Sequence, residues 1–213
     1  MIKIMLVDDH DLVRTGVRRL LEDNPDLEIV GEACSGEEAI SVIKEMKPDV
    51  VLMDLNMPGI GGLETTKKIK HLMPNVRVIV VTMVDDTMFP QRLLKAGASG
   101  YLTKGAKSEE IMRAIRDAMV NKRYISPDLA LKMATASDED KSPFDELSER
   151  ELQVLMMLLE GQRVTEISNK LFLSPKTIST YRARLHEKLN VKTDIELTRL
   201  AIEHGIIAGN PKL

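Results

Sequence analysis

The sequence predicts an α/β domain with a doubly wound, five-stranded parallel sheet, followed by a small all-α domain. Three observations predict this arrangement. Up to about residue 122, short apolar runs rich in β-branched residues alternate with helical patterns, which is typical of a parallel sheet covered by helices on both faces. A small, polar stretch follows, and after it no β-rich run returns. A chain of 213 residues is long enough for two such domains.

Five short apolar runs are the expected strands, and each is apolar enough to be buried on both faces of the sheet. They cover residues 3–7, 27–31, 50–53, 76–81 and 100–103. Helical patterns lie between and after them, near residues 12–23, 36–46, 62–72, 87–96 and 108–121. We expect Ser35 and Ser108 to be N-caps of two of these helices. Strands and helices that alternate in this way indicate an open, doubly wound sheet.

The chain changes character after residue 122, so we take residues 1–122 as the first domain. Residues 123–146 include a small, polar stretch without aliphatic periodicity and are the expected linker. Residues 147–208 are the expected second domain. It contains helical patterns at 148–160, 164–171, 175–189 and 194–205.

Composition and charge exclude several classes of protein. The chain has 30 basic and 33 acidic side chains and a net charge of −3, with 43% apolar residues, which is an ordinary globular composition. No run approaches the ~18 apolar residues of a membrane span, and the N-terminus lacks the pattern of a signal peptide. The single Cys34 excludes an intrachain disulfide. We therefore expect a cytoplasmic protein that does not associate with membranes.

Five polar side chains are expected to meet at one edge of the predicted sheet. Asp8 and Asp9 end the first strand, and Asp54 ends the third. Thr82 ends the fourth strand, and Lys104 follows the fifth. Ligands of open α/β sheets bind outside the carboxyl ends of the strands. A single Asp after a strand is more often a turn or cap residue, but five polar residues at the same edge favour a site.

Three carboxylates at close range repel one another unless a cation is bound. Hard oxygen ligands that leave room for water and phosphate suit Mg²⁺. Asp54 stands alone on its strand and is the expected nucleophile toward phosphorus, which would give an aspartyl-phosphate. Lys104 and the Thr82 hydroxyl would bind phosphoryl oxygens. The expected metal ligands are Asp8, Asp9, Asp54 and the Asn56 carbonyl.

The second domain shows the pattern of two helices joined by a tight turn. Ser148 and Glu151 have the spacing of a capping box, and Gly161 lets the chain turn sharply. Ser174 and Pro175 have the order of an N-cap and a first-turn proline. Together these features predict a helix-turn-helix.

The helical pattern over 175–189 is the expected recognition helix. Ile178, Leu185 and Leu189 mark a buried stripe, and residues 163–192 hold seven basic side chains against two acidic ones. A basic run alone is often just a solvated helix face, but the cap, turn and stripe favour a helix that lies in a major groove. We assign DNA contacts to Lys176, Thr177, Ser179, Thr180, Arg182, Ala183, Arg184 and Lys188.

Both domains resemble known families. Residues 1–122 are similar to a CheY-type receiver domain, which has a flavodoxin-like fold; the matching residues are Asp8, Asp9, Asp54, Thr82, Tyr101 and Lys104. Residues 145–208 resemble the LuxR/FixJ/NarL-type helix-turn-helix. Together they resemble a NarL/FixJ-family two-component response regulator. Within that family, the stretch 174–184 is most similar to the GacA/UvrY/LetA type of global regulators.

This resemblance implies a phosphorylation switch. A histidine kinase or phosphotransfer protein would phosphorylate Asp54, and Thr82 and Tyr101 would then remodel the face around residues 83–107. The unphosphorylated receiver would cover the recognition helix, and the phosphorylated protein would bind double-stranded DNA as a homodimer through the helix near 194–205. RNA polymerase is a further candidate partner. We also expect Met83 to narrow water access and lengthen the phosphoryl lifetime.

Two other functions stay open at this point. One is a regulator that binds DNA without phosphorylation. The other is an aspartate-nucleophile phosphatase, which usually has a second acid close behind the nucleophile, whereas Asp54 is followed by Leu55 and Asn56. We expect a regulator of transcription and not an enzyme.

Overall fold

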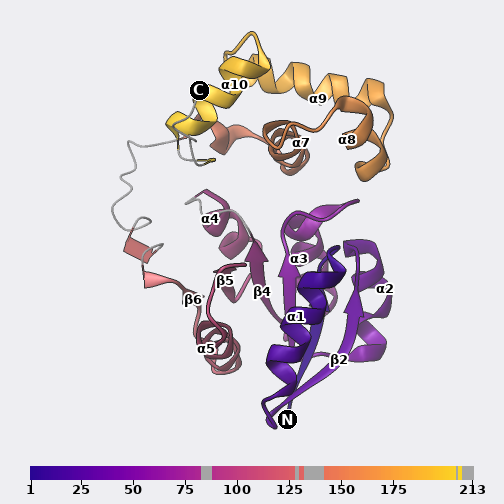
Figure 1. Cartoon of the computed structure of the whole chain (residues 1–213), viewed down its shortest axis with the longest axis vertical. Helices are drawn as coiled ribbons and strands as arrows, with labels where there is room; N and C mark the ends of the chain where they lie inside the picture. Colours follow the sequence, from indigo (N-terminus) through magenta and orange to yellow (C-terminus); the bar gives the residue numbers. More distant parts are fainter. Residues whose placement is uncertain (83–87, 128–129, 132–141, 205, 208–213) are drawn as a thin grey trace. The chain divides into compact units, whose positions relative to one another are not determined.

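The computed structural model describes residues 1–82, 88–127, 130–131, 142–204 and 206–207. The chain divides into two compact units (Figure 1), one with the sheet and its helices and one with the helices from residue 143 onward. Among the described helices, none combines the length and apolarity that a membrane crossing requires.

The first unit is built on a parallel sheet with the strand order β2-β1-β3-β4-β5-β6. Its strands are β1 (Ile2–Val7), β2 (Leu27–Ala33), β3 (Val50–Asp54), β4 (Arg77–Thr82), β5 (Gly100–Thr103) and β6 (Tyr124–Ile125). The doubly wound α/β prediction is confirmed, with one correction. The sheet has six strands and not five, because two residues at the start of the predicted linker pair with β5.

The sixth strand follows from the burial of one side chain. Tyr124 is buried, and its backbone N–H donates to the Ser99 carbonyl at 3.1 Å. Its hydroxyl lies 3.4 Å from Glu110 Oε1. Two residues are too few to form an apolar run, so periodicity gave no signal for this strand.

Helices cover both faces of the sheet (Figure 1). They are α1 (Asp11–Glu22), α2 (Gly36–Met46), α3 (Gly61–Leu72), α4 (Met88–Lys95) and α5 (Ser108–Met119). Alternate strand residues such as Ile4 and Leu6 pack with Leu21 of α1 and Ile115 of α5 in one core cluster. Because strand side chains alternate between the two faces, α1 and α5 lie on the same face of the sheet.

One of the two predicted N-caps of these helices is confirmed. Ser35 Oγ accepts a hydrogen bond from the Glu38 N–H at 3.2 Å. Ser108 is the first residue of α5 and not its cap. The preceding Lys107 N–H donates to Glu110 Oε2 at 3.0 Å, so the acidic side chain that reaches back sets the helix start one residue earlier.

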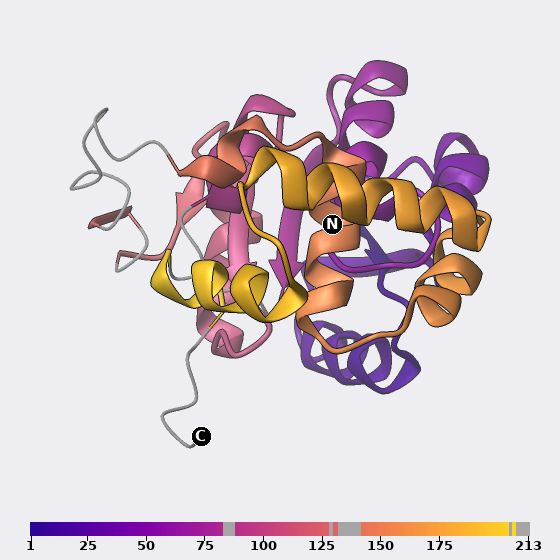
Figure 2. The ribbon, with the colours of Figure 1, turned by 90° about the horizontal axis from the view of Figure 1, so that it is seen from above.

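All the regular secondary structure in the described residues of the second unit is helical, as predicted. It contains the 3₁₀ helix η1 (Pro143–Glu146) and the helices α7 (Glu149–Leu159), α8 (Val164–Leu171), α9 (Pro175–Lys188) and α10 (Asp194–Glu203); α9 and α10 are seen from above in Figure 2. Phe144 of η1 is fully buried and makes an edge contact with His204. This unit therefore begins inside the predicted linker, of which residues 128–129 and 132–141 lie outside the described residues.

Candidate functional sites: an acidic sheet edge and a helix-turn-helix

The structure brings together predicted side chains at the carboxyl ends of β1, β3 and β5. Asp8 directly follows β1, and Asp54 is the last residue of β3. Lys104 Nζ lies 2.7 Å from Asp8 Oδ2 and 3.0 Å from Asp54 Oδ2. All three side chains are largely shielded from water. One ammonium group therefore bridges two buried carboxylates.

Asp9 adds a third carboxylate to this edge. Oxygens of Asp8, Asp9 and Asp54 and a ring nitrogen of His10 all lie within 4.8 Å of one another. Asp9 Oδ1 is buried and accepts no hydrogen bond from any residue that the structure describes; it lies 3.0 Å from His10 Nδ1. A buried carboxylate oxygen that accepts no hydrogen bond, next to two further carboxylates, fits a hard divalent cation such as Mg²⁺. The three predicted carboxylate ligands thus fit the ion, and the role of the Asn56 carbonyl stays a prediction.

The charges at this edge oppose one another. Burial raises the pKa of Asp54, and the negative charge of Asp8 raises it further, while Lys104 and the Asn56 N–H counteract this rise only in part. Burial would lower the pKa of Lys104, but its hydrogen bonds to Asp8 and Asp54 and their charges outweigh that effect and raise it. Lys104 therefore stays charged. Its single positive charge compensates only part of the negative charge of ionised Asp54 beside Asp8.

The other predicted residues of this edge lie in the loop after β3 and on β4 and β5. Asn56 donates its backbone N–H to Asp54 Oδ1 at 3.3 Å, so the chain turns back beside the carboxylate. Thr82 is the buried last residue of β4 and is paired with Thr103. Tyr101 of β5 is also fully buried. Met83 lies outside the described residues.

Glu37 of α2 holds the loop that follows Asp54, and the sequence analysis missed it. Its Oε1 accepts a hydrogen bond from the Ile60 N–H at 3.0 Å. Gly59 has a φ of 73°, which favours glycine, and a Cβ there would lie 2.3 Å from the Glu37 carboxylate, so a larger residue would displace this side chain. No local pattern could reveal this contact, because it joins positions 23 residues apart. His10 was missed for a different reason, since a histidine in a loop is most often solvated.

In the second unit, α8 and α9 form the predicted helix-turn-helix. Ser174 Oγ accepts a hydrogen bond from the Thr177 N–H at 3.1 Å, which confirms the predicted cap, and Pro175 opens α9. In the turn, the Ser168 hydroxyl donates to the Leu173 carbonyl at 2.6 Å. Phe172 adopts the left-handed conformation, with a φ of 53°. The turn is thus fixed by side-chain bonds on both sides.

The two faces of α9 differ as predicted. Ile178, Leu185 and Leu189 are buried. On the opposite face the small or basic side chains that we assigned to DNA are exposed: Lys176, Ser179, Thr180, Ala183 and Arg184. Thr177 is half-buried, and its Oγ1 lies 2.8 Å from Ser174 Oγ.

Two side chains assigned to DNA phosphates have acidic partners within the unit. Lys188 Nζ lies 2.7 Å from Glu151 Oε2 and 3.3 Å from the Glu146 carbonyl oxygen. Arg182 forms an ion pair with Asp194 at the start of α10. The sequence analysis did not anticipate either pair, because the acidic partners lie on other helices.

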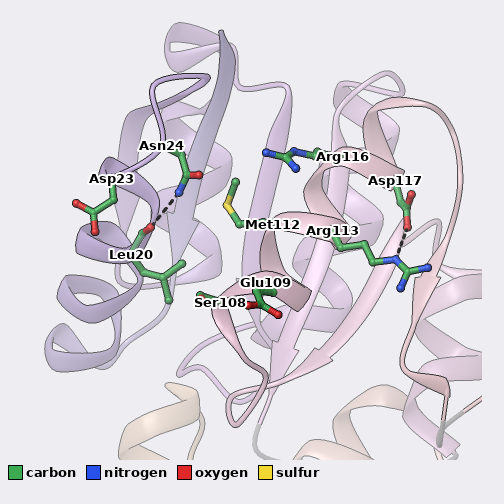
Figure 3. Close-up of a pocket in the computed structure, with 9 residues that line it drawn as sticks. All are labelled: Leu20, Asp23, Asn24, Ser108, Glu109, Met112, Arg113, Arg116 and Asp117. Atoms are coloured by element: carbon green, nitrogen blue, oxygen red, sulfur yellow. Dashed lines mark hydrogen bonds and ion pairs between the residues drawn. The ribbon is translucent and has the colours of Figure 1, made fainter.

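The first unit also has a pocket away from the acidic edge. It measures about 620 Å³ and lies between α1 and α5, where Figure 3 shows Leu20 and Met112 beside charged side chains. Arg113 and Asp117 face each other there at 3.7 Å (Figure 3). None of the predicted site residues lines it. Two arginines and three acidic side chains line this pocket, whereas three carboxylates at the acidic edge face the single ammonium group of Lys104. The acidic edge is therefore the better candidate for chemistry.

The fold and the two sites define a class of protein: an α/β domain with a cluster of carboxylates at one sheet edge, joined to a helix-turn-helix domain. Comparison with known families agrees with this class. Residues 4–116 match the response regulator receiver domain, and residues 145–201 match the bacterial regulatory proteins of the luxR family.

Known relatives give the same result over nearly the whole chain. The chain is 51% identical to the response regulator GacA of Pseudomonas aeruginosa, over 97% of this chain and 98% of that protein. It is 49% identical to the response regulator UvrY of Escherichia coli strain K12, over 97% and 96% of the two chains. The chain therefore belongs to the LuxR-type two-component response regulators, which are transcription regulators.

Solved structures of a more distant relative support this assignment. The Salmonella typhimurium response regulator RcsB is 28% identical and gives a TM-score of 0.76, over 96% of this chain and 98% of that one. RcsB bound to the rprA promoter in the presence of the phosphomimetic BeF₃⁻ gives a TM-score of 0.68 at 28% identity, over 93% and 97%.

Proposed function

We propose that Asp54 is the phosphoacceptor of this regulator. The observation that carries the proposal is the buried ammonium of Lys104, which bridges Asp54 and Asp8. A carboxylate oxygen of Asp54 would form a bond to phosphorus as the bond between phosphorus and the donor's histidine nitrogen breaks. Lys104 and Thr82 would stabilise the phosphoryl oxygens.

The same residues support a Mg²⁺ requirement. Asp8, Asp9, Asp54 and the Asn56 carbonyl would hold the ion. Bound Mg²⁺ would favour the ionised form of Asp54, whose pKa is otherwise raised by burial and by the charge of Asp8. Asp8 and Asp54 are rigidly placed because both are buried directly at strand ends.

A histidine kinase or phosphotransfer protein is the proposed phosphoryl donor. Leu12, in the first turn of α1, is 86% exposed and lies close in sequence to the acidic pair. A large apolar side chain beside a reactive site suits a docking protein, although a single exposed leucine is common in itself. The donor would cover this leucine while its histidine approaches Asp54.

We further propose that phosphorylation switches dimerisation and DNA binding. Thr82 and Tyr101 would carry the change from Asp54 to the face around residues 83–107, and the linker within 123–146 would release the domain over 147–208. The solved complex of RcsB with promoter DNA supports DNA binding, and the exposed small and basic side chains of α9 make it the proposed DNA-binding helix. The protein would act in the cytoplasm, with RNA polymerase as a further partner and no turnover of phosphate esters.

Footprinting with and without acetyl phosphate and Mg²⁺ tests the switch, using a fragment selected from genomic DNA by the phosphorylated protein. We expect phosphorylation, detected by mass spectrometry, to extend and strengthen the footprint of the wild type. The Asp54→Asn protein should show neither the added mass nor the change. Full DNA binding and regulation by the Asp54→Ala protein would instead identify a regulator that works without phosphate.

Substitutions on α9 test the DNA interface separately. Lys176→Ala and Arg184→Ala should weaken binding to all sequences and flatten the salt dependence by about 0.9 in slope for each lost phosphate contact. Thr180→Ala should instead change which sequence is preferred. Salt-dependent anisotropy and a selection from random sequences measure the two effects, and equal behaviour of all three variants would contradict the assignment.

A further inference from the structure

Arg182 and Asp194 join the recognition helix to the helix that follows it. Arg182 Nε lies 2.9 Å from Asp194 Oδ1, and Arg182 Nη2 lies 2.7 Å from Asp194 Oδ2. Both carboxylate oxygens therefore face one guanidinium in the bidentate arrangement that arginine forms with carboxylates and phosphates alike. His186 Nε2 also lies 2.9 Å from Asp194 Oδ1. Asp194 thus binds the guanidinium group of Arg182 through two oxygens, as a phosphate group would.

The pair is accessible to water, which makes it exchangeable. The side chains of Arg182 and Asp194 are 41% and 43% exposed, and exposed ion pairs contribute little to stability. Lys188 offers a contrast, because its partner Glu151 is 4% exposed and also accepts a hydrogen bond from the Ser148 N–H. Lys188 therefore anchors α9 to α7, whereas Arg182 could exchange its partner without exposing a buried charge.

The position of Arg182 on α9 directs it to the wall of a DNA groove. It is three residues after the exposed Ser179, so the two share one flank of the helix. When a recognition helix lies in the major groove, its exposed face meets the base edges and its flanks face the sugar–phosphate backbone. A phosphate at that wall would present the same two acceptor oxygens as Asp194.

We propose that Asp194 competes with DNA phosphate for Arg182 and thereby restrains binding to DNA of any sequence. In free protein the carboxylate holds the guanidinium at the junction of α9 and α10. When DNA is bound closely enough, a phosphate replaces the carboxylate. This inference rests on the proposed role of α9 as the DNA-binding helix.

Anisotropy of a fluorescein-labelled duplex of scrambled sequence, titrated with the full chain at several KCl concentrations, tests the proposal. Asp194→Asn should raise the affinity roughly fivefold at low salt and steepen the slope of log K against log salt by about 0.9, the value for one added phosphate contact. Arg182→Ala combined with Asp194→Asn should bind no more tightly than Arg182→Ala alone. Asp194→Glu, which keeps the charge, should retain the wild-type slope.

Glu203→Gln is the matched control. Glu203 lies on the same helix, and its substitution by glutamine removes the same charge. In the wild type it is paired with the exposed Arg199 at 3.5 Å. If Glu203→Gln raises the affinity as much as Asp194→Asn, or if the effect of Asp194→Asn persists alongside Arg182→Ala, the proposal is wrong. Arg184→Ala must weaken binding in the same assay; if it does not, α9 is not the interface, and the proposed function fails rather than the competition alone.

Discussion

Asp54 illustrates how a single side chain can be placed for reactivity at a cost in stability. Its carboxylate is buried beside Asp8, and Lys104 compensates for only part of the resulting rise in its pKa. A raised pKa in the folded state means that the protonated form is favoured by folding, so stability is lost as the pH rises through that pKa. At neutral pH the ionised residue therefore destabilises the first unit until a cation is bound.

Asp54→Asn should for this reason raise the melting temperature of the first unit by a few degrees at pH 7 without Mg²⁺. The asparagine resembles the protonated acid, so the difference should shrink as the pH falls through the raised pKa of Asp54. Saturating Mg²⁺ should stabilise the wild type and not the variant. Calorimetry measures all three effects. A variant less stable than the wild type at neutral pH without Mg²⁺ would show that the ion pair with Lys104 dominates.

Glu151 is the opposite case. Burial would raise its pKa, but hydrogen bonds from Lys188 and Ser148 outweigh burial and lower it. A lowered pKa in the folded state stabilises the fold above the unfolded-state pKa, and this contribution is lost as the pH falls through the folded-state value.

We expect Glu151→Gln to destabilise the second unit by about 2–3 kcal/mol at pH 7, because it removes charge-assisted hydrogen bonds and leaves Lys188 without its partner. The difference from the wild type should disappear in acid. Urea unfolding at several pH values measures it. The double variant with Lys188→Gln is the control and should lose little more; a full additional loss would mean that the two side chains act independently.

At the scale of single residues, the sequence was sufficient to predict the place of a site side chain wherever the strand topology alone determined it. Asp8, Asp54 and Lys104 could be placed together because the carboxyl ends of parallel strands meet at one edge. Side chains that contact a site residue from a different helix had no such pattern in the sequence to reveal them. Asp194 and Glu151 are therefore absent from the predicted set, although they bind two of its members.

At the scale of elements, the loop between β3 and α3 depends on a neighbouring helix. The N-cap residue of α3, Ile60, has no side-chain cap of its own, and Glu37 of α2 accepts its backbone N–H. The same loop carries Asn56, whose carbonyl is a proposed Mg²⁺ ligand. Glu37 is thus a positioning residue for the acidic edge.

Glu37→Ala should weaken Mg²⁺ binding by about tenfold, the low end of the effects seen when a residue behind a metal ligand is lost. Glu37→Gln keeps a hydrogen-bond acceptor and should restore most of the affinity. Calorimetric Mg²⁺ titration measures the effect directly, and the rate of phosphorylation by acetyl phosphate should fall only at low Mg²⁺. Equal loss in both variants would point to the charge of Glu37 and not to its hydrogen bond.

Elements were predictable in proportion to their length and periodicity. The five apolar runs and the four helices of the second unit were all found in the sequence, with ends that differ by at most two residues. The two-residue strand β6 and the four-residue η1 were missed, although each is anchored by a buried aromatic side chain, Tyr124 in β6 and Phe144 in η1. In such short elements, tertiary burial of one aromatic residue replaces the periodic signal.

At the scale of the whole molecule, two exposed apolar residues suggest two different partners. Leu12 at the start of α1 is 86% exposed, and Ile195 at the start of α10 is 83% exposed. Ile202 is seven residues after Ile195 and is also exposed, so one face of α10 carries both isoleucines. We assign Leu12 to the phosphoryl donor and the α10 face to a second copy of the chain.

Ile195→Ser should weaken dimerisation of the phosphorylated protein at least tenfold, because burying one such side chain on each partner contributes about 1.5–3 kcal/mol. The free energy of unfolding of the monomer should hardly change, since Ile195 is exposed there.

Leu12→Ser is the matched control: it should slow phosphorylation by a histidine kinase but leave both acetyl phosphate labelling and dimerisation intact. Sedimentation equilibrium and the two labelling rates separate these effects. If Leu12→Ser impairs dimerisation and Ile195→Ser does not, the second copy docks on the first unit, and the assignment of the two surfaces must be reversed.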